Sequence, residues 1–137
     1  MSPMGPDLFK INFDAAVNRR DNCGITYAIA KDHQLQPRGW SCKKVYVILD
    51  LLVLKSLACR EALLPTQAKG FYKVNLEGDC QILIKLINGD IVSTLLEIHN
   101  ILKDVKTLST TFQDISFSYV PRICNKTNSF FSCHCFE

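Results

Sequence analysis

The sequence predicts an α/β fold in which a five-stranded mixed sheet is flanked by helices. Three observations lead to this class. Alternating apolar and polar residues, the pattern of strands with one buried face, occupy the first third of the chain. Runs rich in Leu and Ala at helical spacing follow, and short strand-like segments return between and after them. The predicted order is β-β-β-α-β-α-α-β with a short C-terminal segment, and 137 residues suit one domain spanning 1–137.

Three strands that can pair as consecutive hairpins begin the chain. Residues 8–17 alternate apolar and polar side chains, which places Asp14 on the polar face of the first strand. A turn rich in Asn, Asp and Gly leads to a second strand over 25–30. A third strand is predicted over 35–42, where Pro37 indicates an edge position or a bulge because proline cannot donate to the ladder.

The first helix is predicted over 46–68, where Leu and Ala dominate and Lys69 and Gly70 provide a stop. Its β-branched N-terminal residues favour a helix less strongly than the rest. The remaining predicted elements are a strand over 71–76, a helix over 80–87, a helix that Ser93 or Thr94 can cap and that ends near Leu108, and a strand that contains Ile115, Phe117 and Tyr119.

Composition limits the partners and the compartment. The net charge of +3 and the pI of about 8.5 permit a polyanionic partner such as nucleic acid without requiring one. Residues 1–10 contain no apolar core of a signal peptide, and the most apolar stretch, 45–54, is interrupted by Asp50 and is too short to span a bilayer. We expect an intracellular protein, cytoplasmic or nuclear, with no membrane segment, and a monomer.

The seven cysteines are odd in number and lie mostly in apolar or element-like segments, which predicts reduced, buried thiols. A zinc site near the C-terminus is disfavoured, because its potential ligands lack the paired short spacing of structural zinc sites and three of them are adjacent. Those potential ligands are Cys124, Cys133, His134 and Cys135.

Four short motifs lie along the chain in the order of one known family. Residues 12–16 read NFDAA, with Ala15 where that family usually has glycine, and residues 58–63 read ACREAL. Residues 77–80 read EGDC and residues 120–125 read VPRICN. Together they resemble the plant-type ribonuclease H-like domain that is associated with reverse transcriptases. This resemblance implies a ribonuclease H fold and an origin in a plant retrotransposon.

In that family two Mg²⁺ ions, held by four carboxylates, hydrolyse the RNA strand of an RNA/DNA hybrid. The resemblance assigns the first-strand aspartate to Asp14 and the aspartate after the fourth strand to Asp79, as catalytic residues and metal ligands. Lys55 stands at the position of the helix glutamate, and Asn128 stands at the position of the last carboxylate or histidine. Two of the four ligand positions are therefore substituted.

Glu61 cannot replace the missing helix glutamate. Six residues along an α-helix turn a side chain by about 240° and move it by about 9 Å, so Glu61 and Lys55 face different points. Two carboxylates and one ammonium leave one net negative charge, which makes two-metal binding improbable. We expect Lys55 to pair with Asp14 or Asp79.

The sequence therefore predicts a ribonuclease H-like domain that binds nucleic acid, with hydrolysis that is weak or lost, as in a pseudoenzyme. The alternative is a catalytically dead domain used for protein interaction, or a retroelement remnant. Trp40 could stack on a nucleotide, but the prediction is that it completes the core. His33 and His99 are expected at the surface or its boundary. Cations that either contact phosphates or are simply solvated are Arg19, Arg20, Lys43, Lys44, Arg122 and Lys126.

Overall fold

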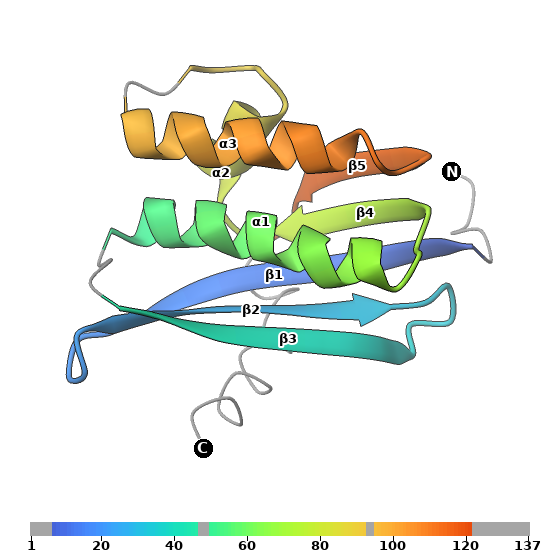
Figure 1. Ribbon diagram of the computed structural model, residues 1–137, viewed down its shortest axis with the longest axis horizontal. Helices are drawn as coiled ribbons and strands as arrows, with labels where there is room; N and C mark the ends of the chain where they lie inside the picture. Colours follow the sequence, from blue (N-terminus) through green and yellow to red (C-terminus); the bar gives the residue numbers. More distant parts are fainter. Residues whose placement is uncertain (1–6, 47–49, 93–94, 122–137) are drawn as a thin grey trace.

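The computed structural model describes residues 7–46, 50–92 and 95–121 (Figure 1). Its order of elements confirms the predicted one. The elements are β1 (Leu8–Asn18), β2 (Cys23–Lys31), β3 (Pro37–Tyr46), α1 (Leu51–Ala68), β4 (Lys73–Gly78), α2 (Gln81–Ile87), α3 (Leu96–Ser109) and β5 (Asp114–Tyr119).

The strands form one mixed sheet in the order β3-β2-β1-β4-β5. The first three strands are antiparallel neighbours, while β4 is parallel to both β1 and β5. Pro37 begins the edge strand β3, and the register between β2 and β3 shifts between Ala30 and Lys31, opposite this proline. Both the edge position and the irregularity predicted from Pro37 are therefore present.

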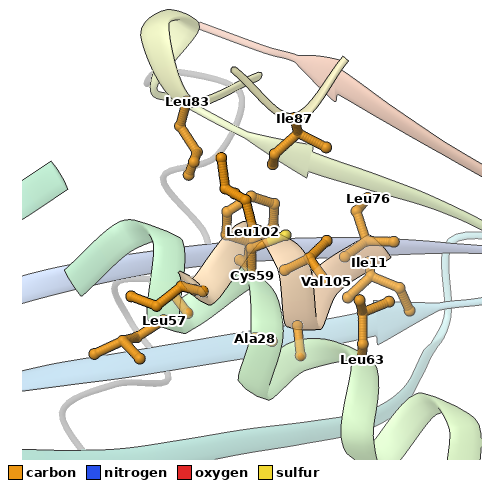
Figure 2. Packing of buried hydrophobic residues seen from close by; sticks show 14 of the residues in the cluster. Ile11, Ala28, Leu57, Cys59, Leu63, Leu76, Leu83, Ile87, Leu102 and Val105 are labelled. Carbon is orange, nitrogen blue, oxygen red and sulfur yellow. The ribbon is translucent and has the colours of Figure 1, made fainter. Parts of the chain in front are cut away.

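Helices α1 and α3 lie side by side over one face of the sheet (Figure 1). Their apolar side chains meet those of the central strands in a single cluster, which Figure 2 shows from close by. In it Leu63 of α1 and Val105 of α3 lie near Ile11 of β1 and Leu76 of β4, all at most 1% exposed. Burial of this cluster is the main force that holds the helices on the sheet.

The start of α1 differs from the prediction. The segment predicted to be helical from residue 46 is strand as far as Tyr46, which pairs with Cys23 of β2, and the helix begins at Leu51. The Asp50 carboxylate caps it by accepting a hydrogen bond from the amide of Val53 at 3.1 Å. Strand pairing keeps the chain extended as far as Tyr46, and the cap defines the helix start. The predicted caps Ser93 and Thr94 lie outside the described residues.

The prediction that Trp40 completes the core is wrong, since its side chain is 65% exposed. Trp40 lies on β3, which has a neighbouring strand on one side only. An edge strand leaves its side chains less enclosed than a central strand does.

The described cysteines are reduced thiols, as predicted: Cys23 and Cys59 are buried, and Cys42 and Cys80 are half-buried. Burial raises the pKa of the Cys59 thiol, so this group is an inert part of the core. The remaining three cysteines lie outside the described residues. Among the helices that the structure describes, none has the length and apolar character needed to cross a membrane.

Candidate active site

A buried ionic cluster lies at the end of the sheet toward which the parallel strands β1 and β4 both run. Lys55, in the second turn of α1, places its Nζ 2.9 Å from Oδ1 of Asp79 and 3.7 Å from Oδ1 of Asp14. The three side chains are 10%, 2% and 3% exposed, respectively. The predicted pairing of Lys55 is therefore confirmed, and it involves both aspartates rather than one.

The parallel pairing of β1 with β4 brings the two aspartates together. Asn12 is opposite Glu77 in the register, and each aspartate follows two residues later on its own chain segment. Between them Gly78 lies against the ring of Phe13, where an added Cβ would come 2.7 Å from Cζ. A glycine at this position lets β4 end close against β1, and so lets Asp79 approach Asp14.

Both carboxylate oxygens of Asp14 accept hydrogen bonds. Oδ1 accepts one from the backbone amide of Ala15 at 2.8 Å, and Oδ2 accepts one from the hydroxyl of Tyr27 at 3.2 Å. The sequence did not identify Tyr27 as a site residue, but the structure places it directly opposite Asp14 in the β1–β2 pairing. The alternating pattern predicts that the two strands pair as a hairpin, but it leaves their register open.

Burial and ion pairing explain the direction of the pKa shifts of Asp14 and Lys55. Burial raises the pKa of Asp14, and the nearby charge of Asp79 adds to this, against the opposing effects of the Ala15 amide, Lys55 and Tyr27. Burial disfavours the ammonium of Lys55, but its hydrogen bond to Asp79 and the charges of both aspartates outweigh this. The pKa of Lys55 therefore lies above its usual value, and the residue stays protonated at neutral pH.

Glu61 lies outside this cluster, as expected from its spacing. Its carboxylate is 2.8 Å from Nζ of Lys43 and 3.8 Å from Nε of Arg60. The helix therefore directs Lys55, not Glu61, to the aspartates, as the alignment of this helix with the family motif predicts. Asn128 lies outside the described residues.

These residues do not fit a pair of Mg²⁺ ions. The ammonium of Lys55 lies within reach of both aspartates, at the point where a cation would bind. In the described ranges no group of three or more His, Cys, Asp or Glu side chains is placed to hold a metal. Mg²⁺ needs several oxygen ligands in octahedral geometry, whereas the three described groups bring one net negative charge.

Four of the cations singled out in the sequence lie at one end of the sheet. Arg19 and Arg20 are exposed in the turn between β1 and β2, and the pairing of β2 with β3 brings Lys43 and Lys44 toward the same end. Lys44 has its Nζ 5.8 Å from the ring centroid of Tyr46. The start of α1 lies at this end too (Figure 1). Phosphates bound here would therefore be near the end of the sheet that contains the ionic cluster.

The remaining candidates are two histidines and two further cations. His33 and His99 are exposed, in agreement with the surface position expected for them. Arg122 and Lys126 fall outside the described residues.

Comparison with solved structures identifies the fold. Ribonuclease H1 from the archaeon Halobacterium salinarum superposes with a TM-score of 0.83 at 19% identity, over 90% of this chain and 92% of that one. The N-terminal RNase H domain of a Mycobacterium tuberculosis protein, solved as a fusion with maltose-binding protein, gives 0.81 at 13% identity, over 90% and 88%.

A third structure is LC11 ribonuclease H1 in complex with an RNA/DNA hybrid, from compost metagenomic DNA, with a TM-score of 0.80 at 12% identity over 89% of this chain and 91% of that one. Identities this low show the ribonuclease H-like fold and nothing finer. No curated protein matches the sequence. A family model described as reverse transcriptase-like matches residues 12–135. With nearly its whole length matched, the chain belongs to the reverse transcriptase-like family.

Proposed function

We propose that this protein is a ribonuclease H-like domain that binds nucleic acid of the RNA/DNA hybrid class, and that its hydrolytic activity is weak or lost. The position of Lys55 is the observation on which this proposal depends. Its ammonium is 2.9 Å from Asp79 and 3.7 Å from Asp14, the two carboxylates that the family motifs assign to the metals.

Electrostatics supports the loss of metal-dependent hydrolysis. An ammonium about 4 Å from a divalent cation repels it by roughly 8 kcal/mol at an effective dielectric constant near 20. Lys55 also neutralises charge on the aspartates, so it supplies part of what the Mg²⁺ ions of the family would supply. The fold is preserved, and Asp14 and Asp79 are proposed as the remaining catalytic positions.

Two observations support binding to nucleic acid. The exposed Arg19 and Arg20 lie at the end of the sheet that contains the cluster, and the net charge of the chain is positive. One structure with the same fold, LC11 ribonuclease H1, was solved with an RNA/DNA hybrid. Electrostatic contacts with phosphates would give this protein affinity without requiring catalysis.

The test combines binding and cleavage on one RNA/DNA hybrid. Fluorescence anisotropy should show binding that weakens as salt rises, and incubation with Mg²⁺ should leave the RNA strand intact. Lys55→Glu should cleave better than the wild type, because it restores a family ligand. Cleavage by the wild type that Asp14→Asn abolishes would show an active enzyme and contradict the proposed loss.

Absence of hybrid binding at low salt would favour the second candidate, a domain used for protein interaction or a retroelement remnant. The plant retrotransposon origin, the monomeric state and the extent of the domain over 1–137 stay predictions from the sequence. Size-exclusion chromatography with light scattering would test the monomeric state.

A further inference from the structure

A second candidate site lies at the other end of the sheet from the ionic cluster. It is an open groove of about 330 Å³ formed by the start of β1, the turn before β3 and the segment after α1. Phe9, which lines it, precedes Asp14 by five residues of strand, or roughly 17 Å. The residues that line the groove are Phe9, Asp32, His33, Arg38, Lys69 and Phe71.

One wall of the groove is cationic and is held in place by the buried Asp32, at the start of an exposed turn. The carboxylate of Asp32 accepts hydrogen bonds from the backbone amides of Gln34 and Gln36. It also accepts one from Nε of Arg38 at 2.7 Å. The Gln36 amide, together with Arg38 and the Gln34 amide, holds the pKa of Asp32 below its usual range despite burial. The Arg38 side chain is nevertheless 57% exposed, so it is oriented by Asp32 and still open to a ligand.

A second cation is fixed beside the first. Nζ of Lys69 donates a hydrogen bond to the carbonyl oxygen of Arg38 at 3.0 Å. Gly39 makes this possible, because a Cβ at that position would collide with Nζ of Lys69. Arg38 and Lys69 bring two positive charges against the one negative charge of Asp32, which leaves a net positive wall.

The other wall is aromatic. The rings of Phe9 and Phe71 are stacked, with centroids 3.8 Å apart and planes inclined by only 6°. Both side chains are half-buried, so part of this stacked pair is open to solvent. Planar aromatic ligands bind favourably to such ring pairs, and a neighbouring guanidinium strengthens the contact.

We propose that this groove binds a nucleotide, with the base against Phe9 and Phe71 and the phosphate between Arg38 and Lys69. A nucleotide combines the two features that the groove complements, a planar ring and an anionic group. It could be a free mononucleotide or the phosphorylated end of a single strand, and base stacking does not depend on sequence. This site is independent of the ionic cluster and of hybrid cleavage.

The experiment is a titration, followed by NMR amide shifts, with four probes: AMP, adenosine, inorganic phosphate, and a 5′-phosphorylated tetraadenylate RNA. AMP should shift signals around Phe71 and bind about tenfold more tightly than adenosine or phosphate alone. AMP binding would identify a free nucleotide as the source. Binding of the RNA alone would identify a strand end.

Two variants test the two walls. Lys69→Gln should weaken binding about tenfold by removing a charge-assisted contact. Phe71→Leu should weaken the binding of AMP and leave the binding of inorganic phosphate unchanged. The matched control is Lys106→Gln, an exposed lysine on α3 outside the groove, which should bind like the wild type.

Equal affinity of Lys69→Gln and the wild type would overturn the proposed site, as would the absence of binding by AMP and by the RNA. Circular dichroism of each variant would confirm that it is folded. Replacing Arg19 and Arg20 should weaken hybrid binding and leave AMP binding unchanged. The failure of either proposal is thereby distinguishable from the failure of the other.

Discussion

A single residue, Lys55, determines the charge of the cluster that Asp14 and Asp79 form. The strands bring Asp14 and Asp79 together, and the group close to both of them is the ammonium of Lys55. A buried pair of like charges needs a cation, and here the protein supplies it from its own chain. Among the described residues, the cluster is therefore an ion-pair network in which one ammonium contacts two carboxylates.

Removing this ammonium should destabilise the protein in a pH-dependent manner. Lys55→Met leaves two buried carboxylates without their cation, which should lower the free energy of unfolding by about 3–5 kcal/mol at pH 7. The loss should be smaller at acidic pH. A carboxyl with a raised pKa in the folded state, such as Asp14, destabilises the native state only at pH values where it is ionised, and protonation relieves this.

Urea unfolding at pH 7 and near pH 5 measures both effects. Lys106→Met, which changes an exposed lysine on α3, is the control and should alter stability by about 0.5 kcal/mol or less. An equal loss for Lys55→Met at both pH values would show that the ionisation of the aspartates is not what destabilises the variant.

One substitution at the same residue should create a response of the melting temperature to Mg²⁺. Millimolar Mg²⁺ should leave the melting temperature of the wild type unchanged, because the ammonium of Lys55 is close to both aspartates. Lys55→Glu should gain a Mg²⁺-dependent rise in melting temperature, since a ligand that binds only the folded state stabilises it. Lys55→Gln, which removes the charge without adding a ligand, separates the two causes. Mg²⁺ stabilisation of the wild type would contradict the proposed role of Lys55.

At the scale of elements, the boundaries of α1 determine where Lys55 points. The helix begins at Leu51, after the cap Asp50, so Lys55 falls in its second turn and faces the sheet. Glu61, further along the same helix, faces Lys43 of the edge strand instead. A helix that began at residue 46 would have removed the pairing of Tyr46, the last residue of β3, with Cys23.

Asp50→Ala should therefore weaken the start of α1. It removes the hydrogen bond to the amide of Val53 and should lower the free energy of unfolding by about 1 kcal/mol, within the range of helix caps. Asp50→Asn keeps an oxygen at the same position and should recover most of the loss. Thermal unfolding of the three proteins measures this. Identical stability of Asp50→Ala and the wild type would show that sheet pairing alone defines the helix start.

At the scale of the whole molecule, the excess of positive charge is small, and the cations are distributed unevenly over the surface. The net charge is only +3, yet Arg19 and Arg20 are neighbours in an exposed turn. A polyanion would contact this local pair of cations, so the distribution of charge matters more for its binding than the net charge does. Binding through such a cluster releases counterions, which makes affinity sensitive to salt.

Replacing both arginines should lower the salt dependence of hybrid binding. For Arg19→Gln with Arg20→Gln, the slope of log affinity against log salt should fall by about 1.8 if each arginine contacts one phosphate. The charge-matched control is Lys85→Gln with Lys103→Gln, two exposed lysines on α2 and α3. A slope that falls equally in both double variants would show a general charge effect rather than contacts in this turn.

The sequence by itself determined the order of the elements and the members of the ionic cluster. Burial of one face leaves a repeating pattern in each strand and helix, and such patterns are local. Asp14, Lys55 and Asp79 could be chosen because short motifs surround them. The alignment that excluded Glu61 needed only the geometry of a single helix.

Only the tertiary structure decided the features that depend on which segments become neighbours. The hydroxyl of Tyr27 on Asp14, the exposure of Trp40 and the start of α1 all follow from strand pairing and sheet order. The stacked rings of Phe9 and Phe71 likewise come from segments far apart in the chain. Periodicity reports which side of an element is buried, but contacts across the sheet are set by packing of the whole chain.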